Sequence, residues 1–89
     1  LGRMNRLEIE CDVYRSSTKE HLYLFVKAGE GMVFVPQDLL LQFGKPEKAL
    51  SVVISPDRVL AKEDPELVVK NLLEQGYHLQ LPPADKRFV

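Results

Sequence analysis

Three acidic side chains alternate along the first apolar segment and are the first candidates for chemistry. In LEIECDVY, residues 7–14, Glu8, Glu10 and Asp12 share one face of a strand, with neighbours roughly 6.5–7 Å apart. Paired carboxylates can act as general acid and base, or hold Mg²⁺ or Ca²⁺. A single flat strand does not enclose an ion, however, and the chain has no glycine-containing calcium loop. We therefore expect a solvated face whose charges discourage edge-to-edge pairing.

Cysteine and histidine supply the only soft metal ligands, and they are scattered. A structural zinc site takes four ligands, usually in close pairs such as CxxC, whereas this chain offers Cys11, His21 and His78. Cys11 falls on the apolar side of its strand, where a free thiol behaves as a small hydrophobe rather than an exposed nucleophile. We expect no metal, no cofactor and no catalytic residue.

A polar loop, YRSSTK at residues 14–19, is a candidate anion-binding element. Arg15 offers a bidentate fork and Ser16 a hydroxyl, which together could contact a phosphate or a carboxylate. The loop lacks the glycines of a phosphate-cradling GxxxxGK[ST] sequence, and serines in such connections commonly bond their own backbone. The turn-forming role is favoured, and Arg15 is the residue that it explains least. Tyr14 and Tyr23 either form an aromatic platform on which bases stack or pack against the hydrophobic core.

The segment EQGYHLQLPP, residues 74–83, supplies a second polar face. Gly76 is expected to close a helix with a positive φ, and a strand follows over 77–81. Alternation gives that strand an apolar face and a polar face, formed by Tyr77, Leu79 and Leu81 and by His78 and Gln80 respectively. Because two short helices cannot cover every strand, we expect the polar face to stay partly open. The predicted interaction surface joins it to the polar loop: Tyr14, Arg15, Ser16, His78 and Gln80.

The helices and strands that position these residues are predicted from hydrophobic periodicity and from the residues that begin and end each element. We predict strands over 7–14, 21–27, 49–54 and 77–81, an optional short strand over 32–35, and helices over 36–46 and 63–76. In the second helix Asp64 is the expected N-cap and Pro65 the first residue. The order β-β-(β)-α-β-α-β predicts an α+β fold, an α/β/α sandwich in which a small mixed sheet carries two helices.

Length and composition set the class of protein. The 89 residues allow one domain, placed at 6–83 between an added or flexible N-terminal segment, 1–5, with Met4 as the expected native start, and a flexible C-terminal tail, 84–89. The 12 basic and 13 acidic residues nearly cancel, which argues against a dedicated nucleic-acid binder. A single cysteine indicates a reducing, cytoplasmic location. No apolar run approaches the roughly 18 residues that span a bilayer, so no membrane partner is expected.

Five short motifs punctuate the chain from about Cys11 to Pro83. They are YRSS at 14–17, YLFV at 23–26, VP at 35–36, FGKP at 43–46 and EQGYHLQLPP at 74–83. In this order and spacing they resemble the YcgL-domain family of small bacterial proteins, found chiefly in gammaproteobacteria. The resemblance implies an unusual α/β/α sandwich and no established biochemical activity. The chain departs from the family before Cys11, where an acidic strand extension replaces a shorter start.

We therefore predict a cytoplasmic, non-enzymatic module that binds another macromolecule, in the first place a protein. An RNA-binding or RNA-processing accessory role is the alternative, and it requires a contiguous basic patch of Arg15, Lys19, Arg58 and Lys62. A small enzyme is the third hypothesis, and it requires a pocket with convergent polar groups and perturbed pKa values.

Overall fold

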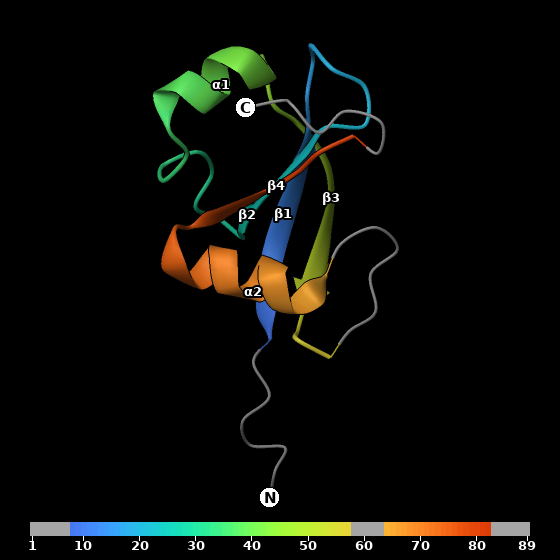
Figure 1. The fold of residues 1–89 in the computed structure, drawn as a ribbon, viewed down its shortest axis with the longest axis vertical. Helices are drawn as coiled ribbons and strands as arrows, with labels where there is room; N and C mark the ends of the chain where they lie inside the picture. Colours follow the sequence, from blue (N-terminus) through green and yellow to red (C-terminus); the bar gives the residue numbers. More distant parts are fainter. Residues whose placement is uncertain (1–7, 58–63, 83–89) are drawn as a thin grey trace, which may run out of the picture.

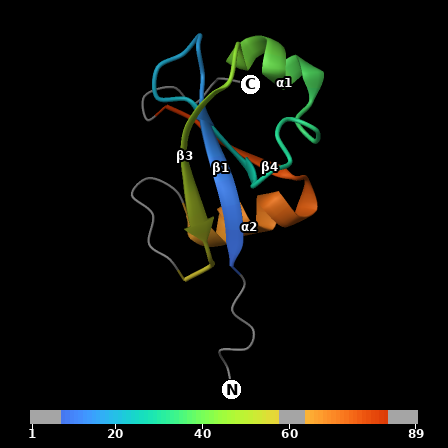
Figure 2. The same ribbon diagram turned by 180° about the vertical axis from the view of Figure 1, so that it is seen from behind.

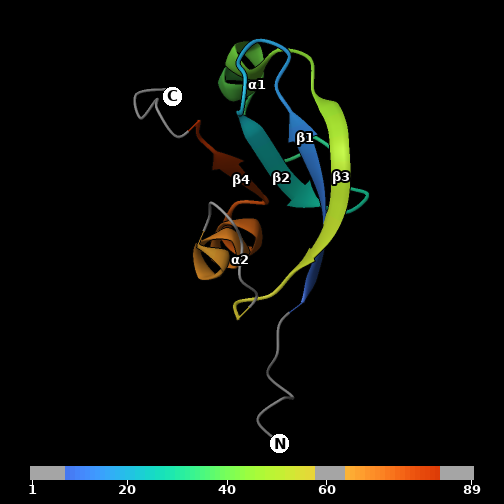
Figure 3. The same ribbon diagram turned by 90° about the vertical axis from the view of Figure 1, so that its right-hand side faces the viewer.

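The computed structural model describes residues 8–57 and 64–82, which form one antiparallel sheet and two helices. Their order is β1 (Ile9–Arg15), β2 (Tyr23–Lys27), α1 (Gln37–Phe43), β3 (Glu47–Ile54), α2 (Pro65–Glu74) and β4 (Tyr77–Gln80). The strands lie in the order β3-β1-β2-β4, which Figure 3 shows across the sheet. The small α+β fold with two helices is confirmed, and its sheet, expected to be mixed, is antiparallel at each described pairing.

The optional strand over 32–35 is not formed, and these residues make consecutive turns instead. Both sides of β2 are occupied, by β1 and by β4, so no free edge is available for a hairpin partner. Local turn bonds take over, such as the one from Val35 N–H to the Met32 carbonyl at 3.1 Å. Val35 still reaches the core, whereas Phe34 is left exposed.

The helix ends are set by the residues that the sequence indicates. Asp64 caps α2 by accepting a hydrogen bond from the Glu66 N–H at 3.0 Å, and Pro65 opens the helix. Gly76 follows its last turn with φ 89°, as predicted. Gly44 closes α1 with φ 80° and donates its N–H to the Leu40 carbonyl. Within the described ranges, neither helix has the length and apolar character that crossing a membrane would require.

Each helix covers one face of the sheet, so the chain forms three layers. On the α2 face the buried side chains are Cys11, Val13, Phe25, Ile54, Val68, Val69 and Leu72. On the α1 face they are Leu22, Leu24, Val26, Val35 and Phe43. Figure 1 places α1 near one end of the strands and α2 near the other, and Figure 2 shows β3 beside β1 from behind. Because the helices are short and offset, part of each face stays uncovered.

Candidate functional site

Asp12 is the one predicted surface carboxylate that the fold buries. Glu8 and Glu10 are exposed as expected, but the solvated face predicted for Asp12 is wrong, since the residue is only 7% exposed. Its carboxylate accepts hydrogen bonds from the Gly29 N–H at 3.2 Å and the Ser51 hydroxyl at 3.0 Å, and lies 3.3 Å from the Lys48 ammonium. The Gly29 N–H above all, with help from Ser51 and Lys48, lowers the pKa of Asp12 despite its burial. Asp12 thus ties β1 to β3 and to the turn after β2.

We expect Asp12→Asn to be less stable than the wild type at neutral pH, by about 1.5–3 kcal/mol for lost bonds to a charged group. The pKa of Asp12 is lower in the folded state than in the unfolded state. Its ionised form therefore stabilises the fold above the unfolded pKa, and this stabilisation is lost as pH falls through the folded pKa. Because the unfolded pKa is about 3.9, the stabilisation by ionised Asp12 should decrease as the pH falls below roughly 4. Urea unfolding over a pH series measures it.

The matched control for this series is Glu10→Gln, which removes an exposed carboxylate from the same strand and should follow the wild type. The stability gap between Asp12→Asn and the wild type should close in acid. A gap that stays constant from neutral to acidic pH would contradict the assignment.

Cys11 is a core residue and not a nucleophile. Its side chain is fully buried on the α2 face, as predicted. Burial, and then the negative charge of Asp12, raises the pKa of Cys11 to about 11. The thiol is therefore neutral at physiological pH, and thiolate chemistry is suppressed.

The polar loop after β1 closes the C-terminal end of α1. The hydroxyl of Ser16 donates to the Phe43 carbonyl, and that of Thr18 donates to the Gln42 carbonyl at 2.7 Å. In return, the Ser17 hydroxyl accepts the Lys45 N–H at 2.7 Å. Ser16 also stabilises the turn in which it lies, because its hydroxyl oxygen accepts the N–H of Thr18 and of Lys19. The favoured turn-forming role is confirmed, and the contact with α1 adds a role that the sequence analysis missed.

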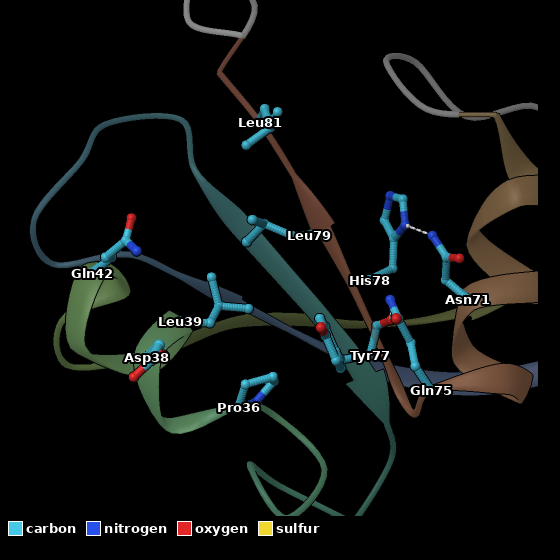
Figure 4. Close-up of a pocket in the computed structure, with 10 residues that line it drawn as sticks. All are labelled: Pro36, Asp38, Leu39, Gln42, Asn71, Gln75, Tyr77, His78, Leu79 and Leu81. Atoms are coloured by element: carbon cyan, nitrogen blue, oxygen red, sulfur yellow. Dashed lines mark hydrogen bonds between the residues drawn. The ribbon is translucent and has the colours of Figure 1, made fainter. Parts of the chain in front are cut away.

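His78 lies beneath α2 and is closed to solvent. Its expected partial exposure is wrong, because the residue is 3% exposed. Asn71 of α2 places its amide nitrogen 2.9 Å from His78 Nδ1 (Figure 4). An amide NH₂ only donates, so Nδ1 is the acceptor in this hydrogen bond. The ring also meets Phe25 edge-to-face, with centroids 5.7 Å apart. A polar residue on the sheet-facing side of α2 thus makes burial of the histidine possible.

The predicted interaction surface is divided among three places. Arg15 and Gln80 line the same groove on the α2 face, with Arg15 also paired to Glu47 at 3.3 Å. Tyr14 packs on the α1 face of the sheet, and Ser16 bonds the end of α1. His78 is covered by α2. Of the five, the structure brings Arg15 and Gln80 together in an open groove, apart from the other three.

The two tyrosines proposed as a platform for bases lie on opposite faces of the sheet. Tyr14 packs on the α1 face and Tyr23 on the α2 face, so they form no common platform. Of the predicted basic patch, Arg58 and Lys62 lie outside the described residues. Across residues 8–57 and 64–82, no three histidine, cysteine or acidic side chains converge in a way that could hold a metal ion.

Within residues 8–57 and 64–82, two of the open grooves lie between the elements. The first, called the edge groove, has a volume of about 450 Å³ and is lined by Pro36, Asp38, Leu39, Gln42, Asn71, Gln75, Tyr77, His78, Leu79 and Leu81 (Figure 4). The second, called the face groove, has a volume of about 440 Å³ and is lined by Val13, Arg15, Tyr23, Phe25, Ala49, Leu50, Val52, Ile54 and Gln80. Both volumes are in the range of ligand-binding clefts. Neither groove was predicted, because each depends on which strands lie side by side.

Comparison with known proteins agrees with the motifs. A family model described as the YcgL domain matches residues 11–83. A YcgL domain-containing protein of Pseudomonas fluorescens is 47% identical over 79 residues, which cover 89% of this chain and 81% of that protein. Relatives of the same description from Pseudomonas syringae pv. tomato and Pseudomonas putida are 46% and 47% identical, with the same coverage. With a match over most of its length and relatives this similar, the chain belongs to the YcgL-domain family.

Proposed function

We propose that this protein is a cytoplasmic, non-enzymatic module that acts by binding another protein. The observation that carries the proposal is that the reactive side chains named above are buried or hydrogen-bonded within the fold. Cys11 is buried with a raised pKa, and Asp12 is held by donors from two other segments. His78 is bonded beneath α2, and the hydroxyls of Ser16 and Thr18 close α1. These groups have no open position from which to act on a substrate.

Its open surfaces favour a protein partner over other classes of ligand. The described residues that line the two grooves are mainly apolar or uncharged, and among them Asp38 is the single carboxylate and Arg15 the single lysine or arginine. Grooves of this kind suit apolar side chains of a partner, framed by a few polar contacts. The net charge of −1 gives no electrostatic reason to favour nucleic acid. A buried, reduced cysteine suits the cytoplasm.

The test is affinity capture with the tagged protein from an extract of Pseudomonas fluorescens, the source of a 47% identical relative. We expect a discrete protein that untagged wild type displaces. Leu39→Asp in the edge groove or Leu50→Asp in the face groove should reduce its recovery at least severalfold. The matched control Leu41→Asp changes a leucine of α1 that is 74% exposed and lines neither groove.

Two results would count against the proposal. Recovery of no protein above the tag-only background would remove its basis. Retention that disappears on treatment with ribonuclease would favour the RNA-accessory alternative instead.

A further inference from the structure

The outer edge of β4 presents backbone groups that no other described strand pairs with. Between β1 and β2, the Ala28 N–H donates to the Glu10 carbonyl and the Ser16 N–H to the Leu22 carbonyl. These bonds make the even-numbered residues of β2 face β1, so its odd-numbered residues face β4. In the register of β2 with β4, those odd residues are opposite His78 and Gln80. The N–H and C=O of Tyr77 and Leu79 therefore point to the outer side.

The edge is short and defined at both ends. Gln75 donates its side-chain amide to the Tyr77 carbonyl at 3.1 Å, which agrees with that carbonyl pointing outward. At the other end the strand stops at Gln80, because Pro82 has no N–H with which the ladder to β2 could continue. Leu79 lies between them and presents both a donor and an acceptor, so it is the centre of any added ladder.

The edge groove extends along this edge, and its two walls differ in chemistry. The α1 wall is mainly apolar, formed by Pro36 and Leu39 beside Tyr77, Leu79 and Leu81 of the β4 segment, and it also includes the polar Asp38 and Gln42. The α2 wall is amide-rich, formed by Asn71 and Gln75 (Figure 4). An added strand would alternate its side chains between the walls. Toward α1 they would be apolar except for a basic residue near Asp38, and toward α2 they would be polar.

Both helices contribute walls, and this favours a narrow occupant. A second copy of the chain would bring its own α1 and α2 to its β4 edge, into the space that these walls take up. A single extended segment has no such flanking helices. It can pair with an exposed sheet edge by β-strand addition.

Charge at the groove selects the chemical class of the segment. Among the described residues that line the groove, Asp38 is the one carboxylate, and none is a lysine or an arginine. The C-terminal end of α2, next to Gln75, carries Glu74 and no basic residue in its last turn. A helix C-terminus is itself negative, so this end of the groove attracts a cation and repels phosphate.

We propose that the edge groove binds an extended segment of a partner protein, which adds to β4 as a fifth strand. The segment alternates apolar and polar side chains and carries a lysine or arginine close to Asp38. This inference rests on the proposed function and assigns to it a site and a class of ligand.

The first test uses wild-type protein and peptides selected from a random phage-displayed library. Selected peptides should show the alternation and the basic residue. In NMR amide exchange, Leu79 should exchange quickly in the free protein and be protected by the peptide. The amides of His78 and Gln80 are internal controls, because they bond β2 in both states and should stay protected.

The second test compares matched variants with the same selected peptides. Leu79→Pro and Leu79→Ala both remove a half-buried side chain, but only proline removes the outward N–H, a position where an edge strand tolerates it. We expect Leu79→Pro to bind about tenfold more weakly than Leu79→Ala, as for one lost backbone hydrogen bond. Asp38→Lys should bind more weakly than Asp38→Asn, through repulsion of the basic residue. Thermal unfolding of each variant verifies that it folds, and the wild-type exchange experiment needs no variant.

Several results would overturn the inference. A Leu79 amide already protected in the free protein would mean that the edge is occupied, and a dimer that Leu79→Pro but not Leu79→Ala dissociates would identify a second copy. If peptides bind without changing the amide exchange of Leu79, or if the library yields no peptide, the edge groove is not the binding site. The proposed function would then still be tested by the capture experiment. Binding of oligouridylate in place of peptide would contradict both.

Discussion

Truncation of Phe43 to alanine should destabilise the protein by about 3–5 kcal/mol, the range for buried aromatic side chains. Phe43 is fully buried on the α1 face and is the largest completely enclosed side chain among residues 8–57 and 64–82. It packs among Leu22, Leu24 and Val26 of the β2 segment. The cavity left behind cannot collapse easily, because the Phe43 carbonyl is held in place by Ser16 and Thr18. Urea unfolding with the linear extrapolation method measures the change.

The control for Phe43→Ala comes from the same helix. Leu41 is 74% exposed, so Leu41→Ala should change the unfolding free energy by no more than about 0.5 kcal/mol. A similar loss in both variants would mean that helix propensity, and not core packing, sets the stability of α1.

Gly76→Ala should be destabilising by about 1–3 kcal/mol, through a backbone effect and a steric effect. Its φ of 89° belongs to a region that side chains rarely adopt. A Cβ at this position would also lie 2.7 Å from the Phe34 Cβ. Thermal and urea unfolding measure the sum of the two effects.

A double-mutant cycle with Phe34→Ala separates the two effects. Because the Phe34 Cβ remains in alanine, the cycle relieves only the ring contacts, and partial rescue is expected. Gly29→Ala is the backbone control, since Gly29 has a similar φ of 82° and no atom within 4 Å of an added Cβ. A Gly76→Ala variant no less stable than Gly29→Ala would show that the turn moves away from Phe34 without strain.

Local features of the fold could be predicted from the sequence, because their causes are local. Asp64 and Pro65 start α2, and Gly76 ends it, through bonds and dihedral angles within a few residues. The apolar side of β1 likewise places Cys11 in the core by alternation alone. The two helices and the fold class follow from these signals.

The candidate site could not be predicted in the same way, because its contacts are distant in sequence. Asp12 meets Ser51 across 39 residues, and Ser16 meets Phe43 across 27. No periodicity records which strands become neighbours, so it could not be inferred that Asp12 is buried or that β4 is the outermost of the described strands. His78 differs, since its partner Asn71 is only seven residues away. The pair could not be predicted even so, because Asn71 is a polar residue within the apolar stripe of α2 and the stripe does not show which strand residue it faces.

The hydroxyl contacts at the end of α1 have a consequence for the order in which the structure forms and opens. A helix of seven residues is too short to persist alone in water. Its last carbonyls are satisfied by Ser16 and Thr18, which come into position only when the loop joining β1 to β2 is formed. Helix α1 should therefore be a dependent unit, formed after the β1–β2 hairpin and lost together with the loop when either opens. The motifs YRSS and FGKP therefore stabilise each other, and a substitution in either motif should destabilise both the loop and the end of α1.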